Sequence, residues 1–122
     1  QALVYFEEAR AAYWREVVGR RGLDDVDYIM AEIRVRYHQR VRWPGRVSVG
    51  VRVRRLGKRH FEMEYAVEDE GGELLVSGDT VQIMYDYDAS SSKAIPPEVR
   101  ERIEALEGAF GPGGRPVEGG ES

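Results

Sequence analysis

Two adjacent glutamates, Glu7 and Glu8, lie in the stretch ALVYFEEARAAYWREV at residues 2–17. A carboxylate held beside a reacting carbonyl can act as a general base that activates water. The same pair also suits a solvated acidic turn near the start of a helix, where the helix dipole favours negative charge. Both interpretations stay open from the residues themselves, and for catalysis we rank Glu8 ahead of Glu7.

A second group of chemically capable residues is Lys58-Arg59-His60, which follows Gly57. Charged donors clustered on a turn can bind phosphate through charge-assisted hydrogen bonds while they remain in water. They would equally suit a charged hairpin that resists pairing with another sheet edge. The group ends a basic strip, because residues 34–59 include Arg and Lys but no Asp or Glu. On a chain of net charge −4, this strip predicts one anionic ligand rather than a long polyanion.

Composition excludes several kinds of site. The 122 residues include no Cys, which rules out disulfides and thiolate ligands, and only two His, which argues against a metal site. The mildly acidic charge argues against a sequence-independent nucleic-acid binder. The sequence shows no apolar run long enough to span a membrane and no signal-peptide pattern, so it predicts a cytoplasmic protein.

The periodicity of apolar residues predicts the elements that hold these groups. Residues 2–19 repeat at helical spacing, and a short helical turn is expected at residues 24–28. Apolar and polar residues then alternate in residues 32–38, 47–54 and 61–68, which predicts half-buried antiparallel strands. A longer strand covers residues 73–87, with Leu75, Val81, Ile83 and Tyr85 on one parity and a bulge or bend at Gly78. A closing helix covers residues 98–107 and ends at Gly108.

This order of elements predicts an α+β fold in which a curved antiparallel sheet wraps around one long central helix. Only the first helix is long enough to cover the apolar face of the sheet. Residues 1–108 are expected to form this single domain. Residues 109–122 are rich in Gly and Pro and are expected to form a flexible tail.

An ordered set of segments resembles the hotdog-fold acyl-CoA thioesterases of the 4-hydroxybenzoyl-CoA thioesterase family. The phrase LVYFEEAR, followed by Tyr13-Trp14, is similar to that family's central helix. The other matching segments are Arg36-Tyr37, Trp43-Pro44-Gly45 before the next strand, LGKRHF at residues 56–61 and IPPE at residues 95–98. Together they cover residues 2 to about 107 in the order and spacing of the family.

The resemblance implies a thioesterase that hydrolyses a CoA thioester to the free acid and CoA, with CoA as part of the substrate and no further cofactor. Lys58, Arg59 and His60 would contact the CoA nucleotide, and Tyr5 would line the substrate pocket. Backbone amides at the start of the first helix would polarise the thioester. Active sites would form between subunits, which implies a homodimer or a homotetramer.

The catalytic Asp of the resembling family lies on a loop before its central helix. The resemblance therefore places that Asp, and the first strand of the sheet, upstream of Gln1, and leaves Glu8 as the candidate within the sequence. The alternative is a non-catalytic acyl-CoA or acyl-carrier binding protein of the same fold. A hotdog dehydratase would need a catalytic His on the first helix or its preceding loop, and the predicted helix has none.

Overall fold

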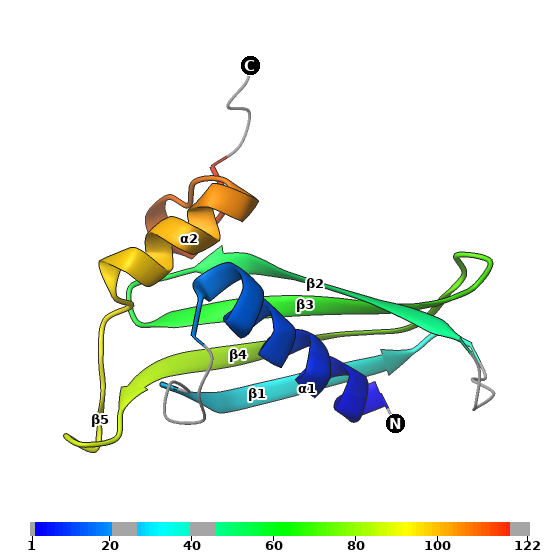
Figure 1. The fold of residues 1–122 in the computed structure, drawn as a ribbon, viewed down its shortest axis with the longest axis horizontal. Coiled ribbons are helices and arrows are strands. Elements are labelled where there is room, and N and C mark those ends of the chain that lie inside the picture. Colours follow the sequence, from blue (N-terminus) through cyan, green and yellow to red (C-terminus); the bar gives the residue numbers. More distant parts are fainter. Residues whose placement is uncertain (1, 21–26, 40–45, 118–122) are drawn as a thin grey trace.

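The computed structural model describes residues 2–20, 27–39 and 46–117 (Figure 1). Helix α1 (Ala2–Tyr13) continues into a π-helical turn, η1 (Trp14–Val18). Four long strands form the sheet: β1 (Tyr28–Tyr37), β2 (Val47–Leu56), β3 (His60–Asp69) and β4 (Leu74–Asp86). A short strand β5 (Ser91–Ser92), helix α2 (Pro97–Glu107) and a 3₁₀ turn η3 (Pro112–Gly114) follow.

The sheet is antiparallel with the spatial order β1-β4-β3-β2, and β5 pairs with the end of β4. Helix α1 crosses one face of the sheet diagonally, as Figure 1 shows, and its main backbone contacts are with β2 and β3. The predicted α+β arrangement of a sheet against one long helix is therefore confirmed. Among the described residues, the free edge of β1 and the free edge of β2 are the two margins of the sheet.

The end of the first helix depends on Gly19. This residue adopts a left-handed conformation with φ of 84°, and its N–H donates to the carbonyl of Trp14. A left-handed C-cap is the usual way for a glycine to end a helix. The predicted short helical turn at residues 24–28 lies mostly outside the described residues, but Tyr28 begins β1, so the prediction is wrong for that residue.

Aromatic side chains fill the space between α1 and the sheet. Phe6 stacks on Tyr65 with ring centroids 4.5 Å apart, and Trp14 stacks on Phe61 at 5.3 Å. All four rings are buried. Such pairs contribute about 0.5–1.5 kcal/mol beyond the burial of their area. They fix the position of α1 over β3.

Gly78 lets α1 approach the sheet closely. A Cβ atom at this position would lie 2.4 Å from Cε2 of Phe6 and 2.5 Å from the carbonyl oxygen of Arg34. The pairing of β4 with β1 and β3 runs through Gly78 without a register shift. The bulge expected at Gly78 is therefore absent, and the glycine instead makes room for the Phe6 ring.

Strand β1 has an uncovered apolar face. Ile33 is 49% exposed and Tyr37 is 63% exposed, although both were expected on a covered face of their strand. The reason is the position of α1, which packs on β2 and β3 and leaves the β1 margin open. Leu3, Val4 and Ile29 are further exposed apolar residues.

Residues 109–117, which the sequence predicts as the first part of a flexible tail, form a small hairpin against the end of β2. Gly111 N–H donates to the carbonyl of Arg115 at 2.7 Å, and Val117 N–H donates to that of Ala109 at 2.9 Å. Gly114 is buried with φ of 78°, and a Cβ there would lie 2.9 Å from the backbone nitrogen of Gly57. Close backbone contact between two glycines seats this hairpin on the β2–β3 turn.

Candidate functional site

A hollow of about 200 Å³ opens between the first turns of α1 and the β1 margin of the sheet. Its lining combines apolar and polar side chains: Leu3, Phe6, Glu7, Arg10, Ile33 and Thr80. Binding sites for small molecules typically have this composition, an apolar wall with a few placed polar groups. We call it the helix hollow.

Buried polar groups lie behind the helix hollow. Tyr65 Oη and Thr80 Oγ1 are 2.7 Å apart, and Gln82 Nε2 donates to the same Thr80 oxygen. Tyr65, Thr80 and Gln82 are all at most 2% exposed. Arg10 Nη1 donates to Tyr65 Oη at 3.1 Å, so the guanidinium joins this buried set. We call these four residues the polar floor.

Arg10 also affects Tyr28. Burial raises the pKa of Tyr28 above its usual value, while the charge of Arg10 and its hydrogen bond work in the opposite direction. Arg10 itself is half-buried. No carboxylate among residues 2–20, 27–39 and 46–117 lies within 4.0 Å of its guanidinium. In the described part of the chain, the hydrogen-bond partner of the Arg10 guanidinium is the hydroxyl of Tyr65.

The two candidate glutamates differ in position. Both are exposed, but Glu7 lines the helix hollow whereas Glu8 does not. Tyr5 is half-buried and packs against the core. It is also absent from the lining of the helix hollow. The structure thus places Glu7, rather than Glu8, beside the hollow.

The amino end of α1 supplies backbone donors near the same hollow. The first N–H groups of a helix have no acceptor within the helix and carry partial positive charge. Ala2 is buried, and Leu3, one residue later, lines the hollow. Developing negative charge on a carbonyl oxygen at this point would meet oriented amides.

The three basic residues of the β2–β3 turn do not act as one group. Lys58 and His60 line a second hollow of about 410 Å³ together with Arg100 of α2 and glycines of the C-terminal hairpin. Arg59 donates instead to the carbonyl and the hydroxyl of Ser92. Arg100 donates to the carbonyl of Gly57, which fixes the guanidinium beside the turn. We call this site the turn hollow.

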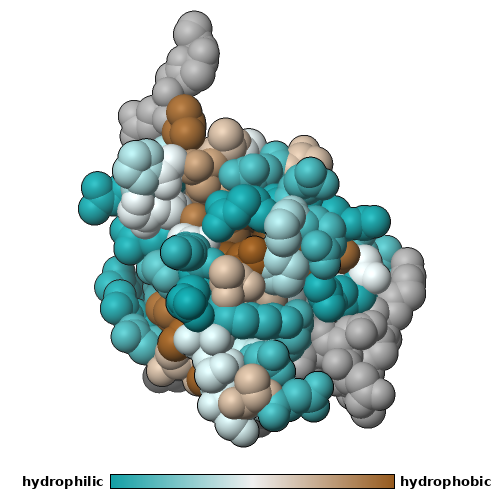
Figure 2. Space-filling model, turned by 90° about the vertical axis from the view of Figure 1, so that its left-hand side faces the viewer, coloured by the Kyte–Doolittle hydropathy of each residue, from teal (hydrophilic) through white to brown (hydrophobic). Residues whose placement is uncertain are grey.

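Figure 2 shows the end of the molecule at which the β2–β3 turn and the start of α2 lie. Its surface is mainly hydrophilic, with small hydrophobic areas between. A largely hydrophilic surface with the cations Lys58, Arg59 and Arg100 suits a soluble anionic group.

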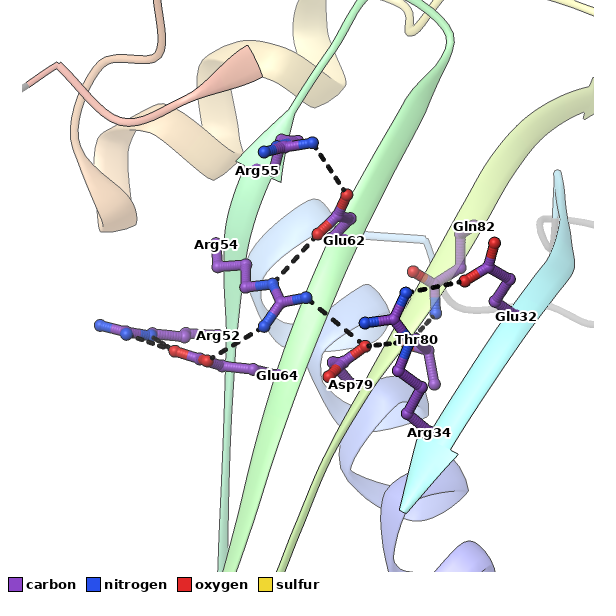
Figure 3. A network of polar contacts seen from close by, with 10 residues as sticks. All are labelled: Glu32, Arg34, Arg52, Arg54, Arg55, Glu62, Glu64, Asp79, Thr80 and Gln82. Atoms are coloured by element: carbon purple, nitrogen blue, oxygen red, sulfur yellow. Dashed lines mark hydrogen bonds and ion pairs between the residues drawn. The ribbon is translucent and has the colours of Figure 1, made fainter. Parts of the chain in front are cut away.

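Four arginines of the basic strip predicted to bind an anion are instead paired with carboxylates on the outer face of the sheet. Figure 3 shows Arg54 between carboxylates of two neighbouring strands. It contacts Glu62 at 3.1 Å, Asp79 at 3.4 Å and Glu64 at 3.6 Å. Burial opposes the charge on Arg54, but the hydrogen bond to Glu62 and the three carboxylates outweigh it and raise its pKa. The same network includes Arg34, Arg52 and Arg55.

The sequence did not reveal the polar floor. The core-facing residues of β4 are Val76, Thr80, Gln82 and Met84, the opposite parity from the apolar set Leu75, Val81, Ile83 and Tyr85. The inward parity includes two polar residues, so it looked like the solvent side. The apolar residues Val76 and Met84 share the parity of Thr80 and Gln82. They were the signal in the sequence that this side of the strand faces the core.

The described part of the chain contains no group of three or more His, Asp or Glu residues arranged to hold a metal ion. It also contains no helix with the length and apolar character needed to cross a membrane.

Comparisons with solved structures place the fold among thioesterases. A thioesterase from Thermus thermophilus complexed with coenzyme A and Zn is 30% identical, with a TM-score of 0.76 over 88% of this chain and 78% of that chain. A predicted thioesterase from Bacillus stearothermophilus is 18% identical, with a TM-score of 0.78 over 92% and 82%. A Staphylococcus aureus protein in complex with CoA is 11% identical, with a TM-score of 0.77 over 95% and 72%.

A comparison with curated proteins finds no match. The Thioesterase-like superfamily, in contrast, matches the sequence over residues 1–103, nearly the whole described fold. Together with the hotdog arrangement of helix and sheet, this match confirms the resemblance seen in the sequence. The chain belongs to the Thioesterase-like superfamily and has the hotdog fold.

Proposed function

We propose that the protein is an acyl-CoA thioesterase, which hydrolyses a CoA thioester to the free acid and CoA. One observation supports this most directly. The helix hollow brings a carboxylate, hydroxyl groups and the amino end of a helix to one small space. The Thermus thermophilus relative, a thioesterase complexed with coenzyme A, supports the assignment of substrate class.

The reaction follows from the chemistry of these groups. Glu7 accepts a proton from water as the water oxygen adds to the thioester carbonyl carbon. Amides at the start of α1 stabilise the resulting oxyanion. The C–S bond then breaks, the carbonyl re-forms as the acid, and the CoA thiolate takes the proton that Glu7 accepted from water, which restores the Glu7 carboxylate. Glu7 has this role in the proposal because it is the carboxylate of the described residues that lines the helix hollow.

We propose that the turn hollow binds the nucleotide end of CoA. Lys58 and His60 have no side-chain hydrogen bond or ion pair within the described residues, so their donors are available to a phosphate. Arg59 would contribute at the rim, because Ser92 already accepts its hydrogen bonds. Arg100 adds a third cation that the turn sequence alone did not indicate.

We further propose a homodimer, or a homotetramer built from it, in the cytoplasm. Strand β1 pairs with β4 alone among the described residues, and its apolar side chains Ile29, Ile33 and Tyr37 are exposed. Unpaired edges with exposed apolar side chains favour association. A second copy against this margin would also cover the helix hollow, since Ile33 lines it.

The test is thioester hydrolysis by the full-length protein on a panel of aliphatic and aromatic acyl-CoAs, with release of free thiol as the readout. Turnover of at least one substrate supports the proposal. Binding of CoA, measured by calorimetry, without turnover of any substrate contradicts it and leaves the non-catalytic acyl-CoA binding protein. Acyl-carrier thioesters serve as a second panel.

A further inference from the structure

The polar floor holds a cation under α1 that the proposed hydrolysis does not use. Arg10 is half-buried, and the hydrogen-bond partner that the structure gives its guanidinium is the hydroxyl of Tyr65. Removing a charge from water is costly unless an opposite charge or several hydrogen bonds compensate. A guanidinium has five N–H donors in a planar fork that matches a carboxylate.

The surroundings of Arg10 have further unused hydrogen-bonding capacity. Oε1 of Gln82 is buried and has no hydrogen-bond partner in the described part of the chain. Thr80 both lines the hollow and belongs to the polar floor, so polar groups reach the surface of the hollow. This oxygen is an acceptor, so it would pair with a water or an N–H group of a ligand, and the carboxylate itself would be bound by the donors of Arg10.

The walls of the hollow are apolar. Leu3, Phe6 and Ile33 line it together with Arg10, Glu7 and Thr80. A ligand that fits this lining has an aliphatic body and a polar, anionic end. Glu7 is exposed, so water and salt screen its repulsion of an anion more than they screen the attraction of the half-buried Arg10.

We propose that the helix hollow selects a short acyl group that ends in a carboxylate, and that Arg10 binds this carboxylate. This inference rests on the proposed function, because only the proposed hydrolysis places an acyl group in the helix hollow. Side chains of a helix point toward its amino end, so Arg10 reaches back over the turn of Phe6 and Glu7. From there to Ala2, where the thioester carbonyl would lie, the helix rises about 6 Å. A short dicarboxylic acyl chain spans this interval.

The test compares glutaryl-CoA with 5-methylhexanoyl-CoA, which has the same shape but an isopropyl end. The wild-type protein is expected to prefer glutaryl-CoA by at least about tenfold in kcat/KM, as a charge-assisted contact provides. Arg10→Met should abolish or reverse the preference, and Arg10→Lys should retain part of it. The matched control is Arg15→Met on the exposed continuation of the same helix, which should leave the preference unchanged.

A ligand-binding experiment distinguishes this inference from the proposed hydrolysis. NMR titration of the full-length protein requires no turnover and uses glutaramate and 5-methylhexanamide, in which a neutral amide replaces the thioester and only glutaramate ends in a carboxylate. If some acyl-CoAs are hydrolysed but neither assay favours the compound that ends in a carboxylate, the inference is wrong and the hydrolase stands. If no thioester is hydrolysed but glutaramate binds through Arg10, the carboxylate site stands and the hydrolase is wrong. Equal loss of both substrates in Arg10→Met and Arg10→Lys overturns the inference, since Arg10 would then only support the fold.

Discussion

The hydroxyl of Tyr13 donates a hydrogen bond of 2.8 Å to Oε2 of Glu107, which lies 94 residues further along the chain. The same oxygen accepts the backbone N–H of Val53 at 2.9 Å. One carboxylate oxygen therefore joins the end of α1, the end of α2 and the free edge of β2. The contact closes the fold at the end of the helix opposite to the helix hollow.

Tyr13→Phe tests this contact. At neutral pH the variant should lose about 1–2 kcal/mol of unfolding free energy, as expected for a hydrogen bond to a carboxylate that is partly screened by water. Burial, then the hydrogen bond and the charge of Glu107, raise the pKa of Tyr13 well above its ordinary value of 10.0. Above about pH 10 the unfolded chain loses this proton while the folded chain keeps it, so the wild-type protein becomes less stable. The stability difference between the two proteins should therefore shrink as the pH rises from 10 to 11.

The measurement is urea unfolding of both proteins at pH 7, 10 and 11. Tyr28 titrates in both proteins, so its contribution cancels in the difference. A constant difference across this range would contradict the assignment.

Glu7→Gln tests the proposed general base. Removing the carboxylate should lower kcat about a hundredfold or more, the range of general base catalysis. Glu8→Gln is the matched control, since Glu8 is exposed and lies outside the helix hollow. Steady-state hydrolysis of the best acyl-CoA gives both values. Equal kcat values for the two variants would exclude Glu7 from this role.

Lys58→Ala tests the turn hollow. The variant should raise KM for acyl-CoA by about fivefold to tenfold without changing kcat, because the nucleotide lies far from the bond that breaks. Arg59→Ala should have a smaller effect, because Arg59 is bound to Ser92. Arg46→Ala, at the opposite end of β2, is the control. An unchanged KM in Lys58→Ala would remove the turn hollow from the proposal.

Gly78→Ala tests the close approach of helix and sheet. The added methyl would overlap the Phe6 ring and the carbonyl of Arg34, so we expect a loss of about 2–3 kcal/mol in unfolding free energy. Gly50→Ala in β2 is the matched control, since no atom lies within 4 Å of a Cβ there. Chemical unfolding measures both. Similar stability of the two variants would show that α1 can move away from the sheet at no cost.

Ile33→Lys tests the proposed association through β1. A charge on this exposed apolar margin should weaken self-association and shift sedimentation velocity toward the monomer. Leu106→Lys, at another exposed apolar residue on α2, should leave the distribution unchanged. A dimer that resists Ile33→Lys, with unchanged concentration dependence, would place the interface elsewhere.

Periodicity in the sequence indicated the four long strands and both helices, but β1 begins at Tyr28, four residues before the predicted start, and β5 was not predicted. Strand β3 alternates cleanly between buried residues, such as Phe61 and Met63, and acidic outward residues, so its faces could be assigned at once. Strand β4 was harder, because its outer face has apolar residues and its inner face has Thr80 and Gln82. Local pattern does not show that a polar side chain will find a buried partner on another strand.

The candidate site required tertiary structure for the same reason. Arg10 looked like one more charge on a helix, and only its contact with Tyr65, 55 residues away, shows that it points inward. Likewise, the Arg residues of β2 looked available to a ligand until the register of β2 and β3 brought Arg52 beside Glu64. Charge counted along the chain does not reveal which charges cancel across a sheet.

The ion-pair network around Arg54 constrains the evolution of the sequence on the outer face of the sheet. A mutation at Arg54 leaves several carboxylates close together on neighbouring strands, so it is tolerated best when Glu62, Glu64 or Asp79 changes as well. These positions should therefore covary among relatives, so that the arginine and its carboxylate partners are retained or lost together. Sequence conservation on the outer face of the sheet would then record the compatibility of strands rather than contact with a substrate.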